Sequence, residues 1–184
     1  MIYNLNDHDF GGGHWVEDKQ LHYKEIINEA IIFAMDKHSK QFRKYTGEPY
    51  WVHLAQVAGL VTSVTTDPKI IAIAWLHDIL EDTDTSFSEI SGQFGAKVAC
   101  GVSFLSDAED GNRITRKELS RKRLATAPDY IQNIKVCDLI SNTSSIVLHD
   151  PKFAKVYLEE KRLLLECLSK ADKRLLNLAY NQIK

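Results

Sequence analysis

The chain has 184 residues, of which 44% are hydrophobic and 26% are charged, as in an ordinary globular protein, so extended disorder is excluded. Its 23 basic and 25 acidic residues give a formal net charge of -2, which argues against a general nucleic-acid binder. The longest apolar run, residues 70–76, is far below the ~20 residues that span a bilayer. Three widely spaced cysteines form neither a disulfide framework nor a zinc finger. We expect a cytoplasmic protein without nucleic-acid or membrane partners, and its oligomeric state stays open.

The N-terminal segment differs in composition from the rest of the chain. Residues 1–20 are polar and contain three consecutive glycines, so they are predicted to form a flexible arm. His8 and His14 in this arm are better explained by solvation than by metal binding, because the glycines would not hold ligands rigidly. Residues 21–184 are predicted to form one domain, as the length of the chain favours.

Beyond the arm, apolar residues recur every three to four positions, which indicates helices throughout. Asp67 followed by Pro68 predicts a capped helix that runs to Leu80, and Ser86 with Glu89 forms a capping-box pattern. The remaining helices are predicted over 26–35, from Pro49 to 64, 98–105, 113–127, 129–149, from Pro151 onward and from about 171. Since no stretch alternates with a period of two, the fold class is all-α.

The segment from Ala74 to Asp84 carries an unusual set of polar residues. Its first half is apolar on every face, which is typical of a buried helix, yet His77 and Asp78 follow directly. Glu81 and Asp82 come four residues later and are expected to stack beside His77 and Asp78 on a continuous helix. A structural His–Asp pair is the alternative, but adjacent helical side chains diverge and pair poorly. A functional site is therefore favoured.

Two further residues fit such a site. His53 lies in a mostly apolar helix, where alone it would be explained as a core histidine. Asp138 lies in the middle of an apolar helix, where a cation is one of few ways to keep a buried carboxylate charged. Two imidazoles and two carboxylates without a thiolate suit manganese or iron, and zinc stays open.

These residues resemble the metal-binding signature of the HD-domain phosphohydrolases. Residues 43–50 (RKYTGEPY), 77–83 (HDILEDT) and 138–142 (DLISN) occur in order and are similar to the (p)ppGpp hydrolase domain of RelA/SpoT-type proteins. The resemblance extends from about residue 24 to 150, and the chain is similar to the stand-alone small alarmone hydrolases. It implies a helical HD-domain bundle with a single metal site, and removal of the 3′-pyrophosphate of guanosine tetra- or pentaphosphate, which gives GDP or GTP.

The resemblance also implies a role for individual residues. His53, His77, Asp78 and Asp138 would hold one manganese ion. Glu81 and Asp82 match the catalytic acidic pair that positions or deprotonates the attacking water. The residues implied in substrate binding are Arg43, Lys44, Thr46, Asn142 and Ser145. Two further groups of residues could contact phosphate. One is a set on a basic helix, for which a solvated helix face is the alternative: Lys117, Arg121, Lys122 and Arg123. The other is the pair Tyr157 and Lys161, which could reach a distal phosphate.

Departures from the family pattern keep other readings open. Leu54 stands where the family commonly has proline, and Leu139 and Ser144 stand where the long hydrolases have arginine. The last two changes lie beside the expected nucleoside contacts, so the adenosine analogue (p)ppApp is a rival substrate. The alternatives are another HD phosphohydrolase, acting on nucleoside monophosphates or NADPH, and a catalytically silent nucleotide-binding module. Because all six expected metal and catalytic positions carry suitable residues, the silent module is disfavoured.

Overall fold

The computed structural model describes residues 13–107 and 109–183, and the side chains from residue 25 onward. This part of the chain is helical and contains one isolated antiparallel bridge, between Phe42 and Pro49, which confirms the all-α prediction. The helices are α1 (Gly13–Lys37), α2 (Trp51–Val61), α3 (Pro68–Leu76), α4 (Ile79–Asp82), α5 (Phe87–Phe94), α6 (Ala96–Leu105), α7 (Arg113–Thr126), α8 (Asp129–His149), α9 (Pro151–Cys167) and α10 (Lys173–Asn181). Within the described residues, no helix is long and apolar enough to cross a membrane.

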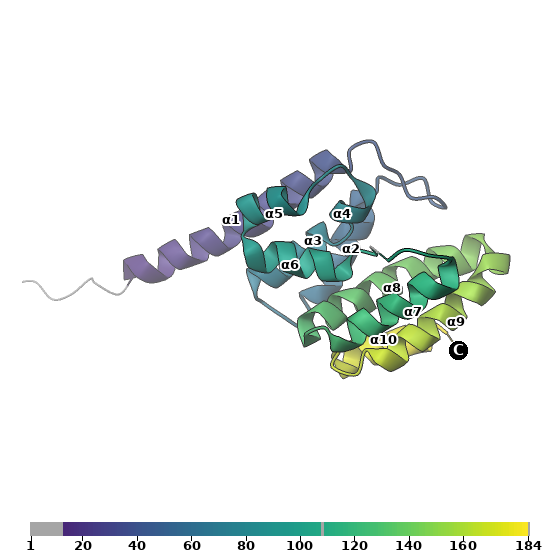
Figure 1. The fold of residues 1–184 in the computed structure, drawn as a ribbon. Coiled ribbons are helices and arrows are strands. Elements are labelled where there is room, and N and C mark those ends of the chain that lie inside the picture. The colour runs from purple at the N-terminus through teal and green to yellow at the C-terminus, as the bar shows by residue number, and fades with distance from the viewer. Residues whose placement is uncertain (1–12, 108, 184) are drawn as a thin grey trace, which may run out of the picture.

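Two helices organise the bundle. α3 is buried along most of its length and packs against α1, α2 and α6. α8 packs against α2 on one side and against α9 and α10 on the other (Figure 1). The α2–α8 contact therefore joins the N-terminal and C-terminal halves of the bundle. Side chains at the end of α3, on α2 and on α8 meet at this junction.

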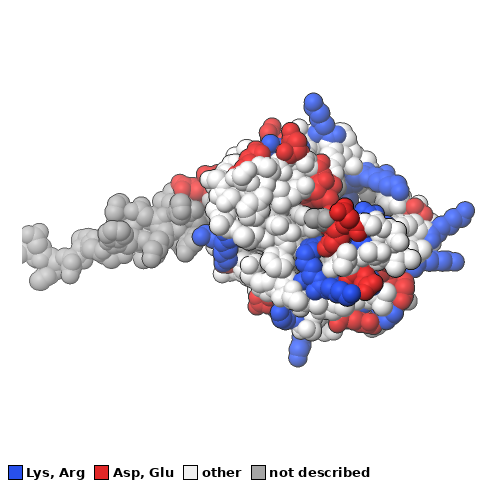
Figure 2. Space-filling view, viewed as in Figure 1, with Lys and Arg blue, Asp and Glu red and all other residues white. Residues whose placement is uncertain are grey.

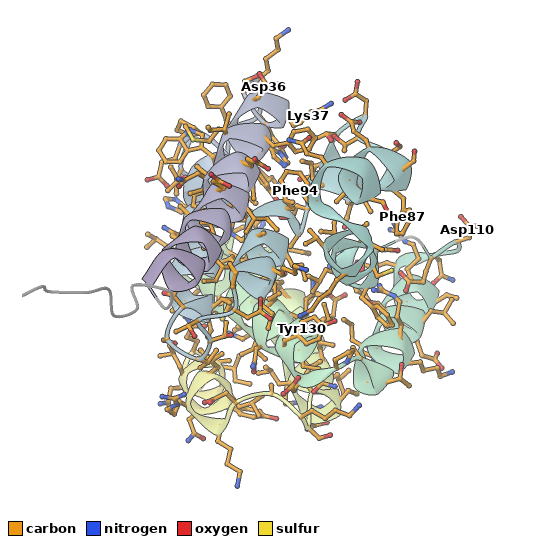
Figure 3. The ribbon with its side chains drawn as sticks, turned by 90° about the vertical axis from the view of Figure 1, so that its left-hand side faces the viewer. Asp36, Lys37, Phe87, Phe94, Asp110 and Tyr130 are labelled. Atoms are coloured by element: carbon orange, nitrogen blue, oxygen red, sulfur yellow. The ribbon has the colours of Figure 1, made fainter. Side chains whose placement is uncertain are left out.

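The packing around α3 is tight. Gly101 of α6 faces Ile73 of α3 so closely that an added Cβ would lie 2.5 Å from the Ile73 Cδ1 atom. A larger residue at 101 would push the two helices apart, because protein cores tolerate little overpacking. On the other side of the core, Phe94 points inward from α5, as Figure 3 shows, and packs edge-on against Phe33 of α1 with ring centroids 5.5 Å apart.

Two helix starts follow the predicted chemistry. The Asp67 side chain accepts the backbone N–H of Lys69 at 2.8 Å, and Pro68 occupies the first helical position of α3. Ser86 caps α5 in the same way by accepting the backbone N–H of Glu89 at 3.2 Å. The local sequence thus determines where both helices begin.

Other predicted boundaries need correction. α2 begins at Trp51 rather than at Pro49, because Pro49 pairs with Phe42 across the loop that precedes the helix. α1 begins at Gly13, inside the range predicted as a flexible arm, since the residues after the glycines are compatible with a helix. The prediction for residues 1–12, including His8, lies outside the described residues. The predicted helix to Leu80 is interrupted after Leu76.

Candidate metal centre and adjoining pocket

The interruption after α3 positions His77. The last carbonyls of an α-helix have no intrahelical partner, and the His77 Nδ1–H donates to one of them, the Ala74 carbonyl, at 2.8 Å. A carbonyl oxygen only accepts, so the proton of neutral His77 lies on Nδ1 and the Nε2 atom carries a lone pair. The end of α3 therefore orients this imidazole with its Nε2 lone pair available.

His53 of α2 is also protonated on Nδ1, because of hydrogen bonds that involve two other side chains. The Ser141 hydroxyl donates its single proton to Gln56 Oε1 at 2.7 Å, so it can only accept from His53 Nδ1, which lies 2.8 Å away. The proton of neutral His53 is thereby fixed on Nδ1, and its Nε2 atom also carries a lone pair. Hydrogen bonds of this kind behind a metal-binding histidine typically fix its tautomer and ring orientation.

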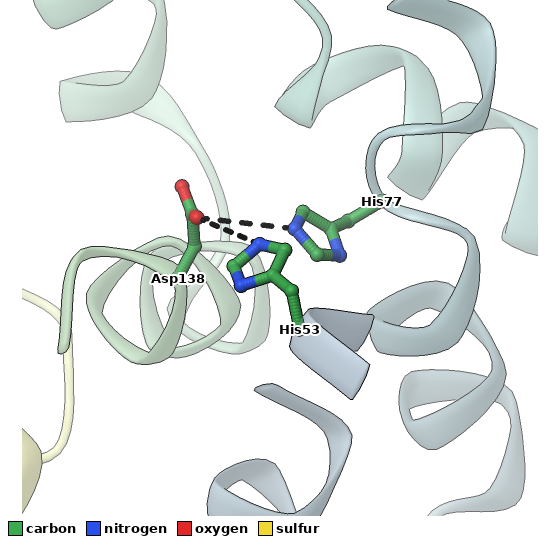
Figure 4. Close-up of side chains that lie close together, drawn as sticks. All are labelled: His53, His77 and Asp138. Carbon is green, nitrogen blue, oxygen red and sulfur yellow. Dashed lines mark ion pairs between the residues drawn. The ribbon is translucent and has the colours of Figure 1, made fainter. Parts of the chain in front are cut away.

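Both Nε2 atoms point at one carboxylate oxygen. Asp138 Oδ1 lies 3.3 Å from His53 Nε2 and 3.9 Å from His77 Nε2 (Figure 4). The two nitrogens are buried and have no hydrogen-bond partner. Lone pairs that converge on a carboxylate repel one another unless a cation lies among them. One ligand atom from each of His53, His77 and Asp138 fits within 4.8 Å of the others, so these buried residues form a candidate metal site.

Asp78 completes the predicted set of four. Its Oδ2 atom lies 3.0 Å from His77 Nε2 and 3.5 Å from His53 Nε2. The Tyr50 hydroxyl donates to the same oxygen at 2.7 Å and holds the carboxylate toward the histidines. The structure therefore brings together all four residues that were predicted from the sequence as metal ligands. They come from α2, from the turn between α3 and α4, and from α8.

The electrostatics of this group favour positive charge at its centre. Burial opposes ionisation of Asp138, yet the Lys135 ammonium at 2.9 Å and His53 hold the pKa of its carboxyl well below the usual range. Burial alone would lower the pKa of His53, but the facing carboxylates of Asp138 and Asp78 outweigh it and raise this pKa to about 9. The carboxylates thus favour a cation, either a proton or a metal ion, at the position of the Nε2 atoms.

A pocket adjoins the group on the side of α7 and α9. It is lined by five carboxylates, among them Asp78 and Asp138, and by five cationic side chains: Arg113, Lys117, Arg121, Lys135 and Lys161. Figure 2 shows basic and acidic side chains interspersed over the C-terminal helices. Three of the cations are paired with pocket carboxylates: Arg113 with Glu160, Lys117 with Asp107 and Lys135 with Asp138.

The two other cations of the pocket have no such partner. Within the described residues, neither Arg121 nor Lys161 forms an ion pair with a carboxylate, although Lys161 is buried. Two basic residues of α7 outside the pocket lining form ion pairs: Lys122 pairs with Glu118, and Arg123 pairs with Asp107 and Glu109. The five cations and five carboxylates of the pocket balance in formal charge, but Arg121 of α7 and Lys161 of α9 are not paired with a carboxylate and can contact an anionic ligand.

The predicted catalytic carboxylates separate. Glu81 lines the pocket with Asp78 and Asp138, and partial desolvation raises the pKa of its carboxyl. Asp82 is not among the residues that line this pocket, and its Oδ2 atom accepts from Gln41 Nε2 at 2.8 Å.

The predicted register of these carboxylates with His77 and Asp78 is interrupted for Glu81 and His77 but kept for Asp82 and Asp78. The prediction assumed one continuous helix, whereas His77 and Asp78 lie in the turn between α3 and the four-residue helix α4, which begins at Ile79. The Glu81 backbone N–H donates to the Asp78 carbonyl at 3.1 Å rather than to that of His77, whereas the Asp82 N–H donates to the Asp78 carbonyl at 2.9 Å, the spacing that the prediction assumed.

The predicted nucleotide-binding residues form a second cluster beside the metal group. The buried guanidinium of Arg43 donates to Asn142 Oδ1 at 3.1 Å and to Ser145 Oγ at 3.2 Å. Asn142 in turn donates to Asp138 Oδ1 at 2.7 Å, so the cluster contacts the candidate metal site directly. Thr46 lines a neighbouring pocket with Arg43 and Ser145.

Lys44 does not join this cluster. Its exposed ammonium lies 4.8 Å from the centroid of the Tyr45 ring, and it lines neither pocket. The backbone reverses direction between Arg43 and Glu48, where the Arg43 N–H donates to the Glu48 carbonyl at 2.8 Å. Neighbouring side chains of such a loop point apart, which is why Arg43 enters the site and Lys44 does not.

Sequence reasoning missed the residues that orient the site. Tyr50 belongs to the RKYTGEPY motif but received no role, and Gln56 and Ser141 were not considered. A signal exists for Ser141, since it is a polar residue in the buried stretch of α8. Gln56 lies three residues after His53, on the same face of α2, although glutamine at such a position is common without function.

The match to known protein families agrees with this geometry. The family model described as an HD domain matches residues 30–137, a span that contains His53, His77 and Asp78 and ends one residue before Asp138. The chain belongs to the HD-domain family. The predicted resemblance to RelA/SpoT-type hydrolase domains is likewise confirmed by relatives that carry such names.

Two curated relatives and one solved structure illustrate the similarity. The guanosine-3′,5′-bis(diphosphate) 3′-pyrophosphohydrolase of Aquifex aeolicus is 37% identical over 145 residues, which are 76% of this chain and 19% of the relative. The Drosophila melanogaster protein with the same activity in its name is 31% identical over 126 residues, which are 67% of this chain and 70% of the relative. The solved structure of a metazoan ortholog of SpoT that hydrolyzes ppGpp matches with a TM-score of 0.79 at 24% identity, over 85% of this chain and 93% of that one, and shows the shared fold.

The extent of these matches differs between relatives. The chain spans about a fifth of the length of the long bacterial relatives, such as 18% of the GTP pyrophosphokinase rsh of Brucella suis, which is 31% identical over 144 residues. The Drosophila relative is matched over most of its length.

Proposed function

We propose that this HD domain hydrolyses the 3′-pyrophosphate of guanosine 3′,5′-bis(diphosphate) and its pentaphosphate analogue in the cytoplasm, giving GDP or GTP and pyrophosphate. The observation that carries the proposal is the pair of buried, unpartnered Nε2 atoms of His53 and His77 that face two aspartates beside a cation-lined pocket. The names of the relatives support the same substrate class.

The residues of the centre fit a divalent ion. His53, His77, Asp78 and Asp138 would hold it, and two imidazoles with two carboxylates suit manganese. A bound ion of this kind lowers the pKa of water and neutralises phosphate charge. Ser141 and the Ala74 carbonyl keep the two imidazoles in the tautomer that such binding requires.

The other residues of the pocket would serve the substrate and the water. Glu81 lies in the pocket with a raised pKa, and it accepts a proton of the attacking water as the water oxygen bonds to phosphorus and the bond from phosphorus to the ribose 3′ oxygen breaks. The same proton then passes to the 3′ oxygen, which leaves as the 3′ hydroxyl. Arg121 and Lys161 supply positive charge that no pocket carboxylate neutralises. Asp82 does not itself line the pocket; held by Gln41 next to Glu81 in the chain, it would help to orient the attacking water.

The nucleoside would bind at the Arg43 cluster with Thr46, Asn142 and Ser145, and the exposed Lys44 would contact phosphate at its rim. Two further residues are the reason to keep the adenosine analogue as an alternative substrate. Leu139 lines the main pocket, and Ser144 lines the neighbouring pocket with Arg43. Both side chains are uncharged, whereas the long hydrolases have arginine at these two positions. The contacts to the base would therefore differ from those in the long hydrolases.

The test is hydrolysis of ppGpp, ppApp and NADPH side by side, with manganese and with chelator, and separation of the products by anion exchange. Manganese-dependent release of pyrophosphate from ppGpp supports the proposal, and the ratio of the ppGpp and ppApp rates decides the base preference. Glu81→Gln is the matched inactive variant, because it keeps the shape of the side chain and removes the proton acceptor.

Two results would contradict the proposal. Faster turnover of NADPH than of either alarmone would assign the domain to another HD phosphohydrolase activity. Nucleotide binding without turnover of any substrate, in protein that holds metal, would indicate a silent binding module.

A further inference from the structure

Asp82 is held by a residue from a different part of the chain. It is the last residue of α4, a helix of four residues that cannot fix a side chain by its own stability. Its carboxylate is anchored by Gln41, which lies in the loop between α1 and α2 and donates from Nε2 to Asp82 Oδ2 at 2.8 Å. The orientation of Asp82 therefore depends on this loop.

The orientation of the Gln41 amide is determined by its two partners. A carboxylate only accepts hydrogen bonds, so the NH₂ group faces Asp82 and Oε1 faces the other way. There His38 Nδ1 lies 2.6 Å from Oε1 and must carry the proton. A flipped amide would bring two acceptors together at Asp82, and it would lose that bond.

His38 anchors this chain of bonds in the core. Its side chain is 1% exposed, and its ring stacks on the Tyr50 ring with centroids 5.1 Å apart. Tyr50 donates through its hydroxyl to Asp78 and through its backbone N–H to the Gln41 carbonyl, at 2.7 and 2.9 Å. The same stacked pair thus fixes Asp82 through Gln41 and Asp78 through Tyr50, and it sets the spacing between them.

We propose that Gln41 is a positioning residue for Asp82, and that His38 fixes the Gln41 amide in the productive orientation. The inference rests on the proposed function, in which Asp82 acts on the attacking water. Gln41 itself does not contact the substrate. Its contribution is the fixed direction of one carboxylate, and small misplacements of catalytic groups cost rate rather than binding.

A double-mutant cycle in the full chain tests this role. Gln41→Ala is expected to lower kcat roughly tenfold, with unchanged KM for ppGpp and unchanged manganese content. Asp82→Ala is expected to lower kcat further, and the double variant should be no slower than Asp82→Ala alone, because Gln41 then has nothing to position. Ser39→Ala, an exposed change in the same loop, is the control and should leave kcat unchanged.

An isosteric variant covers the case in which Gln41→Ala distorts the loop. Gln41→Glu keeps the shape of the side chain but places a carboxylate against Asp82, so kcat should fall at least as far as in Gln41→Ala. Wild-type kcat in either variant overturns the positioning role, as does a double variant whose loss is the product of the two single losses. An inactive wild-type protein with bound metal overturns the proposed function itself, and the positioning role falls with it.

Discussion

Lys161 is expected to make the stability of the protein depend on pH in an unusual direction. Its side chain is 1% exposed, and its ammonium donates to Thr143 Oγ1 and Gln182 Oε1, each at 2.7 Å. Both partners are neutral, so the positive charge is buried without a counter-charge among the described residues. Burial accordingly lowers the pKa of Lys161 from 10.5 to about 8.

The size of the effect follows from this pKa. The difference between 10.5 and about 8 corresponds to about 3 kcal/mol, since one pKa unit equals about 1.4 kcal/mol. Below pH 8 Lys161 is protonated in both states, and the folded state carries the full cost. Between pH 8 and 10.5 the unfolded chain binds more protons than the folded one, so stability should rise with pH.

The matched variant is Lys161→Met, which keeps an unbranched stem and removes the ammonium. It leaves the Thr143 hydroxyl and the Gln182 carbonyl without a donor, so its stability at pH 7 combines the relief of charge burial with the loss of two hydrogen bonds. The informative quantity is therefore the change with pH. Between pH 7 and 10, the wild type should gain about 2 to 3 kcal/mol in unfolding free energy relative to the variant.

Urea unfolding of both proteins at pH 7, 8.5 and 10 measures this difference. Other lysines and the cysteines titrate in both proteins, so their contributions cancel in the comparison. Parallel stability curves for wild type and variant would show that Lys161 keeps an ordinary pKa in the folded protein. The reasoning from its burial would then be refuted.

Three other outcomes test the site itself. Asp138→Asn should weaken manganese binding by more than about tenfold and abolish hydrolysis; unchanged metal content in equilibrium dialysis would contradict the ligand assignment. Ser141→Ala should weaken manganese binding about 10- to 100-fold in competition with a chelator, because the His53 tautomer loses its partner, and equal affinity would remove that role. Arg43→Ala should raise KM for ppGpp about tenfold; a KM equal to that of the wild type would exclude Arg43 from the nucleotide site.

The sequence predicts most of the fold because its helix signals are local. Asp67 with Pro68 and Ser86 with Glu89 determine where two helices begin, and the structure has the expected hydrogen bonds at both. Pro49 misled the prediction because proline favours the first turn of a helix but also fits the bridge with Phe42 that the structure has. Tertiary pairing decides between the two, and no local pattern records it.

The candidate metal site was predictable for a different reason. Histidine and aspartate in apolar helices are costly without partners, so His53, His77 and Asp138 stand out from their surroundings. Their convergence could not be derived from spacing, since it depends on how α2 and α8 pack. The turn at His77 and Asp78 could not be predicted either, because it is stabilised by tertiary contacts such as that of Tyr50 with Asp78.

The hydrogen bonds behind the site connect its parts into one network. Arg43 donates to Gln56 at 3.2 Å, and Gln56 accepts from Ser141, which orients His53. Arg43 also reaches Asp138 through Asn142. A ligand that binds Arg43 therefore acts on two residues of the candidate metal centre. It acts on Asp138 through Asn142, and on His53 through Gln56 and Ser141. Nucleotide and metal should consequently bind with mutual dependence, and such coupling must be equal in both directions.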